Sequence, residues 1–71
     1  MNSATANIVA NGQSQAIALP ATLGQFLAAK GWKPTQVVVE LNGQVVPRPD
    51  VADHPLADGD RVEVIVPVAG G

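Results

Sequence analysis

Two Asn-Gly pairs, Asn11-Gly12 and Asn42-Gly43, constrain the fold of this chain more than any other feature of its sequence. Asn-Gly is the strongest two-residue hairpin signal, because both residues tolerate a positive φ. Each pair is flanked by short stretches that alternate in polarity or are rich in β-branched residues. The sequence therefore predicts two β-hairpins, one near the N-terminus and one in the middle of the chain.

The expected strands are short and are bounded by turn residues or by proline. They comprise residues 7–10, 13–19, 37–41, 44–46 and 61–66. Pro47 and Pro49 follow the fourth of these, which suits an edge strand, because proline cannot donate to a ladder. Residues 49–56 are expected to form a loop or a single helical turn, and residues 58–60 a tight turn.

A single helix is predicted between the two hairpins. Thr22 and Gln25 fit a capping box, in which each side chain bonds to the backbone N–H of the other residue. An apolar stripe at helical spacing follows, made of Leu23, Phe26 and Leu27. The predicted helix covers residues 23–30 and would pack against a sheet through this stripe.

The order of elements is hairpin, helix, hairpin and final strand, and it favours one architecture. Wrapping the sheet around the helix buries the apolar stripe, with the first and last strands parallel at the centre and the hairpins at the edges. This is an α+β roll of the ubiquitin-like β-grasp kind, with a mixed sheet of about five strands on one main helix. We expect a flexible leader at residues 1–6, the domain at 7–66 and a flexible C-terminal tail at 67–71.

Composition excludes several classes of protein. The chain has 71 residues and no cysteine, so one apolar core must stabilise it without disulfides. Its only aromatic residues are Phe26 and Trp32, so the core should be aliphatic. The net charge of −2 argues against nucleic-acid binding, which normally needs a basic surface. The longest unbroken apolar stretch, Val64–Ala69, is too short to span a bilayer. We expect a cytoplasmic protein that is monomeric on its own.

The sequence holds no residue set typical of an enzyme or a metal site. His54 is the only histidine, and no cysteine is present to complete a zinc site with it. Asp50, Asp53, Asp58 and Asp60 lack the spacing and the closing glutamate of an EF-hand. A turn explains the last two better, because aspartate bonds to nearby backbone. Without a Ser/His/Asp set or a Gly-rich phosphate loop, we predict no enzyme, no metal and no bound cofactor.

The C-terminal residues are the feature that points to function. Gly70 and Gly71 follow the last predicted strand closely, and glycine has no Cβ. We interpret Ala69 and Gly70 as a thin thread that enters a narrow partner channel. The thread would deliver the Gly71 carboxylate, which is ionised at neutral pH because a terminal carboxyl has a reference pKa of about 3.3–3.7. From Pro67 onward it would reach roughly 16 Å when extended.

The ordered set of motifs resembles the ThiS family of sulfur carriers of thiamine biosynthesis. The matching segments are residues 7–12, 22–27, 41–48, 55–63 and 70–71. Residues 55–63 read PLADGDRVE and are similar to the family's PLxDGDxVE turn, and Gly70-Gly71 is similar to its terminus. One departure is Val51, at a position where the family often carries an aromatic residue.

This resemblance implies that the Gly71 carboxylate is the sulfur attachment site. A ThiF-like adenylyltransferase would use MgATP to form an acyl-adenylate there, because AMP is a better leaving group than oxide. A persulfide supplied through a cysteine desulfurase would displace AMP and leave a thiocarboxylate on Gly71. A ThiG-like synthase would then accept the sulfur to build the thiazole ring of thiamine.

Alternative functions of other classes stay open at the level of sequence. Residues 67–71 also resemble the tail of MoaD, the small subunit of molybdopterin synthase, although residues 45–48 and the short length favour the thiamine branch. A ubiquitin-like modifier conjugated to lysine would use the same fold and tail. An iron–sulfur carrier would need cysteine ligands, and the chain has none. The acidic balance opposes an RNA-binding role.

Alternation along the last strand predicts a surface for docking. The residues expected to face the helix are Val62, Val64 and Val66. Ile65 would then face solvent with Arg61 and Glu63, one strand's width from Val38 if the two strands are neighbours. We predict that the adenylyltransferase contacts Val38, Arg61, Ile65 and Pro67.

Overall fold

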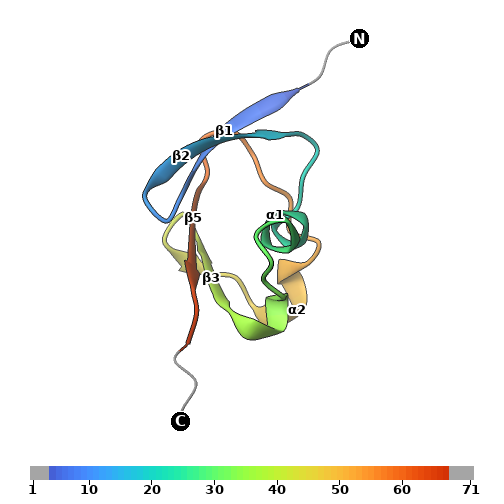
Figure 1. Cartoon of the computed structure of the whole chain (residues 1–71), viewed down its shortest axis with the longest axis vertical. Helices are drawn as coiled ribbons and strands as arrows, with labels where there is room; N and C mark the ends of the chain where they lie inside the picture. Colours follow the sequence, from blue (N-terminus) through green and yellow to red (C-terminus); the bar gives the residue numbers. More distant parts are fainter. Residues whose placement is uncertain (1–3, 68–71) are drawn as a thin grey trace.

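The computed structural model describes residues 4–67, which form a five-stranded mixed sheet wrapped around one main helix (Figure 1). The elements in chain order are β1 (Thr5–Ala10), β2 (Gln13–Ala18), α1 (Leu23–Ala29), the 3-10 turn η1 (Pro34–Gln36), β3 (Val38–Leu41), β4 (Gln44–Val45), α2 (Arg48–Val51) and β5 (Arg61–Ile65). The strand order is β2-β1-β5-β3-β4, and the central pair β1 and β5 runs parallel. The predicted β-grasp fold is confirmed.

Both predicted hairpins are present, and their turns depend on asparagine. Asn11 and Asn42 have φ values of 49° and 54°, in the left-handed region that asparagine tolerates better than most residues. Each is followed by a glycine that also has a positive φ. This geometry belongs to two-residue turns whose twist matches that of the flanking strands. The turns join β1 to β2 and β3 to β4 in antiparallel register.

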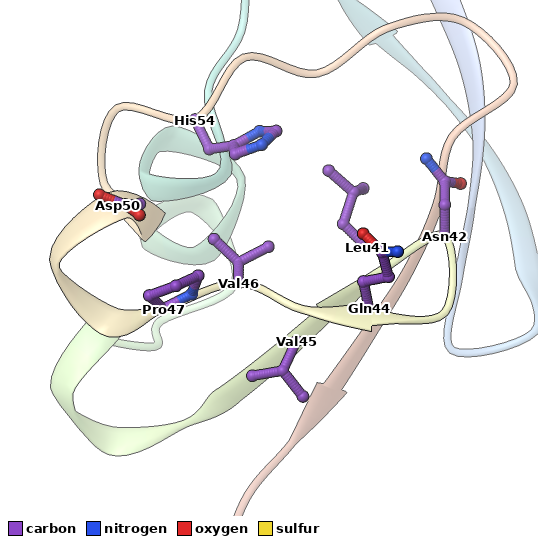
Figure 2. A pocket seen from close by; sticks show the side chains of 8 residues that line it. All are labelled: Leu41, Asn42, Gln44, Val45, Val46, Pro47, Asp50 and His54. Carbon is purple, nitrogen blue, oxygen red and sulfur yellow. The ribbon is translucent and has the colours of Figure 1, made fainter.

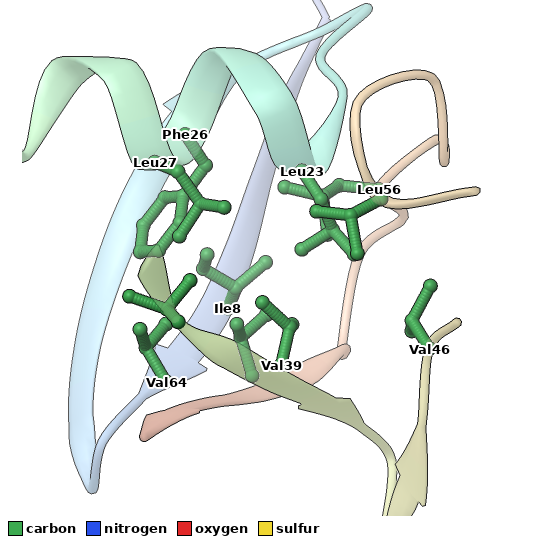
Figure 3. Packing of buried hydrophobic residues seen from close by; sticks show 11 residues of the cluster. Ile8, Leu23, Phe26, Leu27, Val39, Val46, Leu56 and Val64 are labelled. Carbon is green, nitrogen blue, oxygen red and sulfur yellow. The ribbon is translucent and has the colours of Figure 1, made fainter. Parts of the chain in front are cut away.

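Helix α1 begins with the predicted capping box. The Gln25 backbone N–H donates to the Thr22 hydroxyl over 3.1 Å, and the Thr22 N–H donates to the Gln25 side chain over 2.9 Å. The predicted stripe of Leu23, Phe26 and Leu27 is buried. The helix ends at Ala29, one residue earlier than predicted, and packs on the sheet by this face, as Figure 3 shows.

The core is mainly aliphatic, with Phe26 as its one buried aromatic residue, and alternate residues of the central strands point toward α1 (Figure 3). It contains Ile8 from β1, Val39 from β3, and Val62 and Val64 from β5. The segment after β4 closes one end of this core with the buried residues Val46, Val51 and Leu56. Burial of one such side chain contributes about 1.5–3 kcal/mol. Val51 is buried with only 2% of its surface exposed, so this position belongs to the core.

Several predicted boundaries were wrong by one or two residues, and two of these errors misplaced side chains. The predicted leader includes Thr5 and Ala6, but both belong to β1, and only 1% of Ala6 is exposed. The ladder of β1 and β2 continues to this end of the sheet, where the Leu19 N–H donates to the Ala4 carbonyl over 2.9 Å. Val66 does not face the helix: it follows the end of β5, and 53% of it is exposed.

Gly24 allows α1 and α2 to approach closely. A Cβ at this position would lie 2.6 Å from the carbonyl oxygen of Ala52, which is a backbone atom and cannot rotate away. Alanine favours a helix over glycine by about 1 kcal/mol. Overpacking typically costs about 1–3 kcal/mol. The clash should therefore outweigh the gain in helix propensity.

We expect Gly24→Ala to lower the free energy of unfolding by about 1 kcal/mol after these two effects are combined. Urea unfolding followed by the fluorescence of Trp32 measures this change. A variant as stable as the wild type, or more stable, would show that the contact between Gly24 and Ala52 is not tight.

Candidate carrier tail and its docking face

Strand β5 directs the chain toward the C-terminus from the middle of the sheet. Its first half pairs with β1, with Val9 opposite Arg61 and Ala10 opposite Val62. Its residues from Val62 onward pair with β3, ending with Ile65 opposite Val38. Central strands have partners on both edges and are therefore held more firmly than edge strands. Figure 1 shows β5 leaving the body of the domain on the side away from the N-terminus.

The side chain of Asn42 holds the start of β5. Its Oδ1 accepts the Arg61 backbone N–H over 2.8 Å, and its Nδ2 donates to the Asp60 carboxylate over 3.0 Å. The Asn42 backbone N–H also donates to the Arg61 carbonyl over 2.8 Å. The residue that shapes the β3–β4 turn therefore also fixes where β5 begins.

The side chain of Asn11 holds the other half of β5 in the same way. Its Oδ1 accepts the Val64 N–H over 2.8 Å, and its Nδ2 lies 3.5 Å from the Val64 carbonyl oxygen. The Asn11 backbone N–H donates to the Val62 carbonyl over 2.9 Å. The backbone after Asn11 turns away from β5, so the Asn11 side chain makes the bonds to β5 that the next residue of β1 would otherwise make. Sequence reasoning assigned Asn11 only to the turn, because its contact lies 53 residues away.

The turn before β5 explains two of the acidic residues. The Asp60 carboxylate accepts the Ala57 N–H over 2.8 Å in addition to the Asn42 side chain. The Asp58 carboxylate accepts the Asn7 N–H over 2.7 Å. The prediction that these aspartates form a turn is confirmed. Within residues 4–67 no three His, Cys, Asp or Glu side chains gather closely enough to hold a metal ion.

The outward surface of β3 and β5 brings most of the predicted docking residues together. Val38 and Ile65 are direct cross-strand partners. Ile65 has 44% of its surface exposed, whereas Val38 is half-buried. Arg61 lies further along the same face of β5 and is exposed, and Pro67 is exposed just after the strand. We call Val38, Arg61, Ile65 and Pro67 the docking face.

Sequence reasoning missed one exposed apolar residue on this side of the sheet. Val45 in β4 pairs with Glu40, so it shares the outward face, and 59% of it is exposed. The adjacent pair Val45-Val46 gives the signal, since Val46 is buried and a strand must turn the other side chain outward. Val45, Glu40 and Glu63 form one cross-strand row over β4, β3 and β5.

The tail residues Ala69, Gly70 and Gly71 lie outside the described residues. The structure does place the residues that lead into the tail. Val66 and Pro67 are exposed and belong to no strand. The pairing of β5 with β3 ends at Ile65, and Asn11 holds the other edge of β5 only as far as Val64. The sheet therefore holds the chain as far as Ile65.

A hollow beside β4 offers no set of groups suited to catalysis. It has a volume of about 340 Å³ and lies between the β3–β4 hairpin and α2 (Figure 2). His54 and Asp50 line it together with residues of the β3–β4 hairpin (Figure 2). The His54 Nδ1 is 3.0 Å from the Pro55 carbonyl oxygen. This local contact is typical of an ordinary loop histidine.

The strand order, with parallel central strands β1 and β5 wrapped on α1, defines a small β-grasp protein whose described chain leaves the sheet at the end of β5. A family model described as the ThiS family matches residues 3–71. The chain belongs to the ThiS family, and its role is that of a sulfur carrier in thiamine biosynthesis.

A solved structure agrees with this assignment. The crystal structure of thiamine biosynthesis protein ThiS from Geobacter metallireducens is 32% identical, with a TM-score of 0.76. The similarity covers 92% of this chain and 99% of that one. A search of curated proteins found no match. Within residues 4–67 no helix is long and apolar enough to cross a membrane.

The bonds between Asn11 and Val64 can be tested separately from the turn itself. Asn11→Gly keeps a residue that tolerates positive φ but removes both side-chain bonds to β5. We expect it to lower the free energy of unfolding by about 1 kcal/mol, the usual contribution of one or two partly buried hydrogen bonds. Asn11→Asp keeps the oxygen that accepts the Val64 N–H and serves as the matched control.

Native-state amide exchange gives the more specific readout. The Val64 amide should exchange faster in Asn11→Gly than in the wild type and should stay protected in Asn11→Asp. Equal protection of Val64 in all three proteins would mean that the Asn11 side chain does not hold the strand.

Proposed function

We propose that the chain carries sulfur as a thiocarboxylate on Gly71. One observation supports this most strongly: the matched family region extends to residue 71 and ends in Gly-Gly, five residues beyond the exposed Val66 that follows the central strand. A carrier of this kind needs a reactive terminus on a stable body. The backbone and Asn11 bonds that hold β5 supply the stable body.

The chemistry begins with activation of the carboxylate. A carboxylate oxygen of Gly71 attacks the α-phosphorus of MgATP, and pyrophosphate leaves. The resulting acyl-adenylate has AMP as its leaving group. A persulfide sulfur then attacks the acyl carbon, AMP departs and an acyl persulfide forms. A thiol cleaves its S–S bond, so that the donor leaves as a disulfide and Gly71 keeps the sulfur. The chain has no cysteine, so the sulfur has no side-chain thiol to move to.

The proposed partners follow from this sequence of steps. A ThiF-like adenylyltransferase supplies the MgATP site, and a cysteine desulfurase is the indirect source of the persulfide. A ThiG-like synthase accepts the sulfur for the thiazole ring. The match to the ThiS family favours this acceptor over molybdopterin synthase and over a lysine substrate.

The docking face is proposed as the contact with the adenylyltransferase. It lies on the strand that leads to the tail, so a partner seated there would also hold the terminus near its nucleotide. Ile65 is apolar and exposed beside the half-buried Val38. Arg61, on the same face, would act as a polar contact at the rim. Apolar residues at the centre and charged residues at the rim are typical of protein interfaces.

Removal of Gly71 should abolish sulfur loading and leave the fold intact. Intact-mass spectrometry after reaction with adenylyltransferase, MgATP and sulfur donor should show a gain of about 16 Da on the full chain, as one oxygen becomes sulfur. The truncated chain should show no gain and an unchanged melting temperature. The same gain on the truncated chain would refute the assignment of Gly71.

Ile65→Ala should weaken binding to the adenylyltransferase by roughly five- to thirtyfold, because truncating one central interface residue costs about 1–2 kcal/mol. Its melting temperature should change little, because Ile65 is outside the core. Val45→Ala is the matched control, since it truncates another exposed apolar residue of the outward face, on β4, which strand β3 separates from Ile65. Calorimetry of each complex measures both affinities. Equal losses for the two variants would contradict a contact centred on Ile65.

A further inference from the structure

Strand β2 is an edge strand with free backbone groups. It is the last strand of the sheet, and only β1 pairs with it. The Leu19 N–H donates to Ala4, so the odd-numbered residues of β2 direct their N–H and C=O groups toward β1. The groups of Ser14, Ala16 and Ala18 therefore point away from the sheet, where no described strand pairs with them.

This edge lacks the features that usually protect an edge strand. Such strands are commonly short, or carry charges, proline or a bulge. The sequence of β2 is QSQAIA, six residues without charge or proline, and its register with β1 is unbroken. The opposite edge differs in length, since β4 has only two residues, although proline follows both strands, as Pro20 after β2 and as Pro47 after β4. Only the β2 edge presents a long accessible ladder among the described strands.

A groove runs alongside this edge, between β2 and α1. Its volume is about 350 Å³, and its apolar lining includes Ile17, Phe26 and Ala29. Lys30 is at one end, with its Nζ 3.3 Å from the Gln15 side-chain oxygen and 5.6 Å from the centre of the Phe26 ring. No acidic residue lines the groove. The groove thus combines an apolar floor with a single positive charge near the start of β2.

We propose that the β2 edge binds an extended segment of another protein, which adds to the sheet as an antiparallel strand. Main-chain hydrogen bonds to Ser14, Ala16 and Ala18 would hold it, and alternate apolar side chains would enter the groove. An acidic side chain near its C-terminal end would meet Lys30. A second copy of this chain fits less well, because β2 has no acidic residue to place against Lys30.

This site is separate from the docking face. Strands β1 and β5 lie between β2 and β3, so a segment added to β2 leaves Val38 and Ile65 uncovered. The edge would hold one protein while the tail reacts on another. The inference does not depend on the chemistry at Gly71.

A designed peptide tests the proposal directly. The probe is a seven-residue peptide with blocked ends, with valine at its second and fourth positions, glutamate at its sixth and threonine elsewhere. Its matched control has lysine at the sixth position. Titration of the ¹⁵N-labelled full chain to about 1 mM peptide should shift the amide signals of Ser14, Ala16 and Ala18 most strongly. The glutamate peptide should bind about three- to fivefold more tightly than the lysine peptide.

Two variants separate the contribution of backbone hydrogen bonds to peptide binding from the contribution of charge. Ala16→Pro removes an outward N–H that β1 does not use, so the fold should persist, and peptide binding should weaken about tenfold or more. Lys30→Glu leaves the backbone unchanged and should reverse the preference between the two peptides. The melting temperature of each variant shows whether it is folded. Ile65→Ala should bind the peptide as the wild type does.

Three results would overturn the proposal. The first is that no signal shifts up to about 1 mM peptide. The second is that the shifts centre on β3 and β5, or that neither Ala16→Pro nor Lys30→Glu alters binding. The third is a concentration-dependent dimer in light scattering without peptide, with the same β2 amides shifted, which would make a second copy the occupant.

Discussion

The structure depends on two asparagine side chains that bond to one strand. Asn11 and Asn42 each occupy the left-handed region in a two-residue turn, and each then bonds to β5, at Val64 and at Arg61. These contacts join both hairpins to the strand that leads to the C-terminus. Replacing either asparagine with alanine would weaken the turn and remove the side-chain bonds to β5 at once, because alanine disfavours positive φ and has no side-chain amide. Turn geometry and the position of β5 are therefore linked in the same residues.

This linkage is suited to a carrier whose reactive group lies beyond the last strand. The sheet fixes β5 on one edge through β3 and on the other through β1 and then Asn11. Val66 and Pro67 are exposed immediately afterwards. A partner that recognises the docking face therefore receives a terminus whose point of departure is defined. In the proposed function the domain would position the terminus, and the partner would supply the nucleotide and the catalytic groups.

Local patterns in the sequence predicted most of the fold. The Asn-Gly turns, the capping box at Thr22 and the alternation at Val62 and Val64 were all confirmed, because each depends on neighbouring residues. The errors arose at boundaries. Ala6 is small and looked like part of a leader, yet a partner strand holds it in the sheet. Alternation predicted an inward Val66, but β5 ends before it.

The parts of the site that sequence did not predict depend on contacts between distant residues. Nothing near Asn11 in the chain indicates a bond to Val64, and nothing near β2 indicates that its outer edge is unpaired.

The central claim is that sulfur leaves the protein from the Gly71 carboxylate. It is tested most directly by loading the chain with ³⁴S and supplying it to a ThiG-like synthase. The account predicts that the label appears in the thiazole product and that the chain regains an unlabelled carboxylate at Gly71. A thiazole product without ³⁴S, formed while the protein keeps its label, would contradict it.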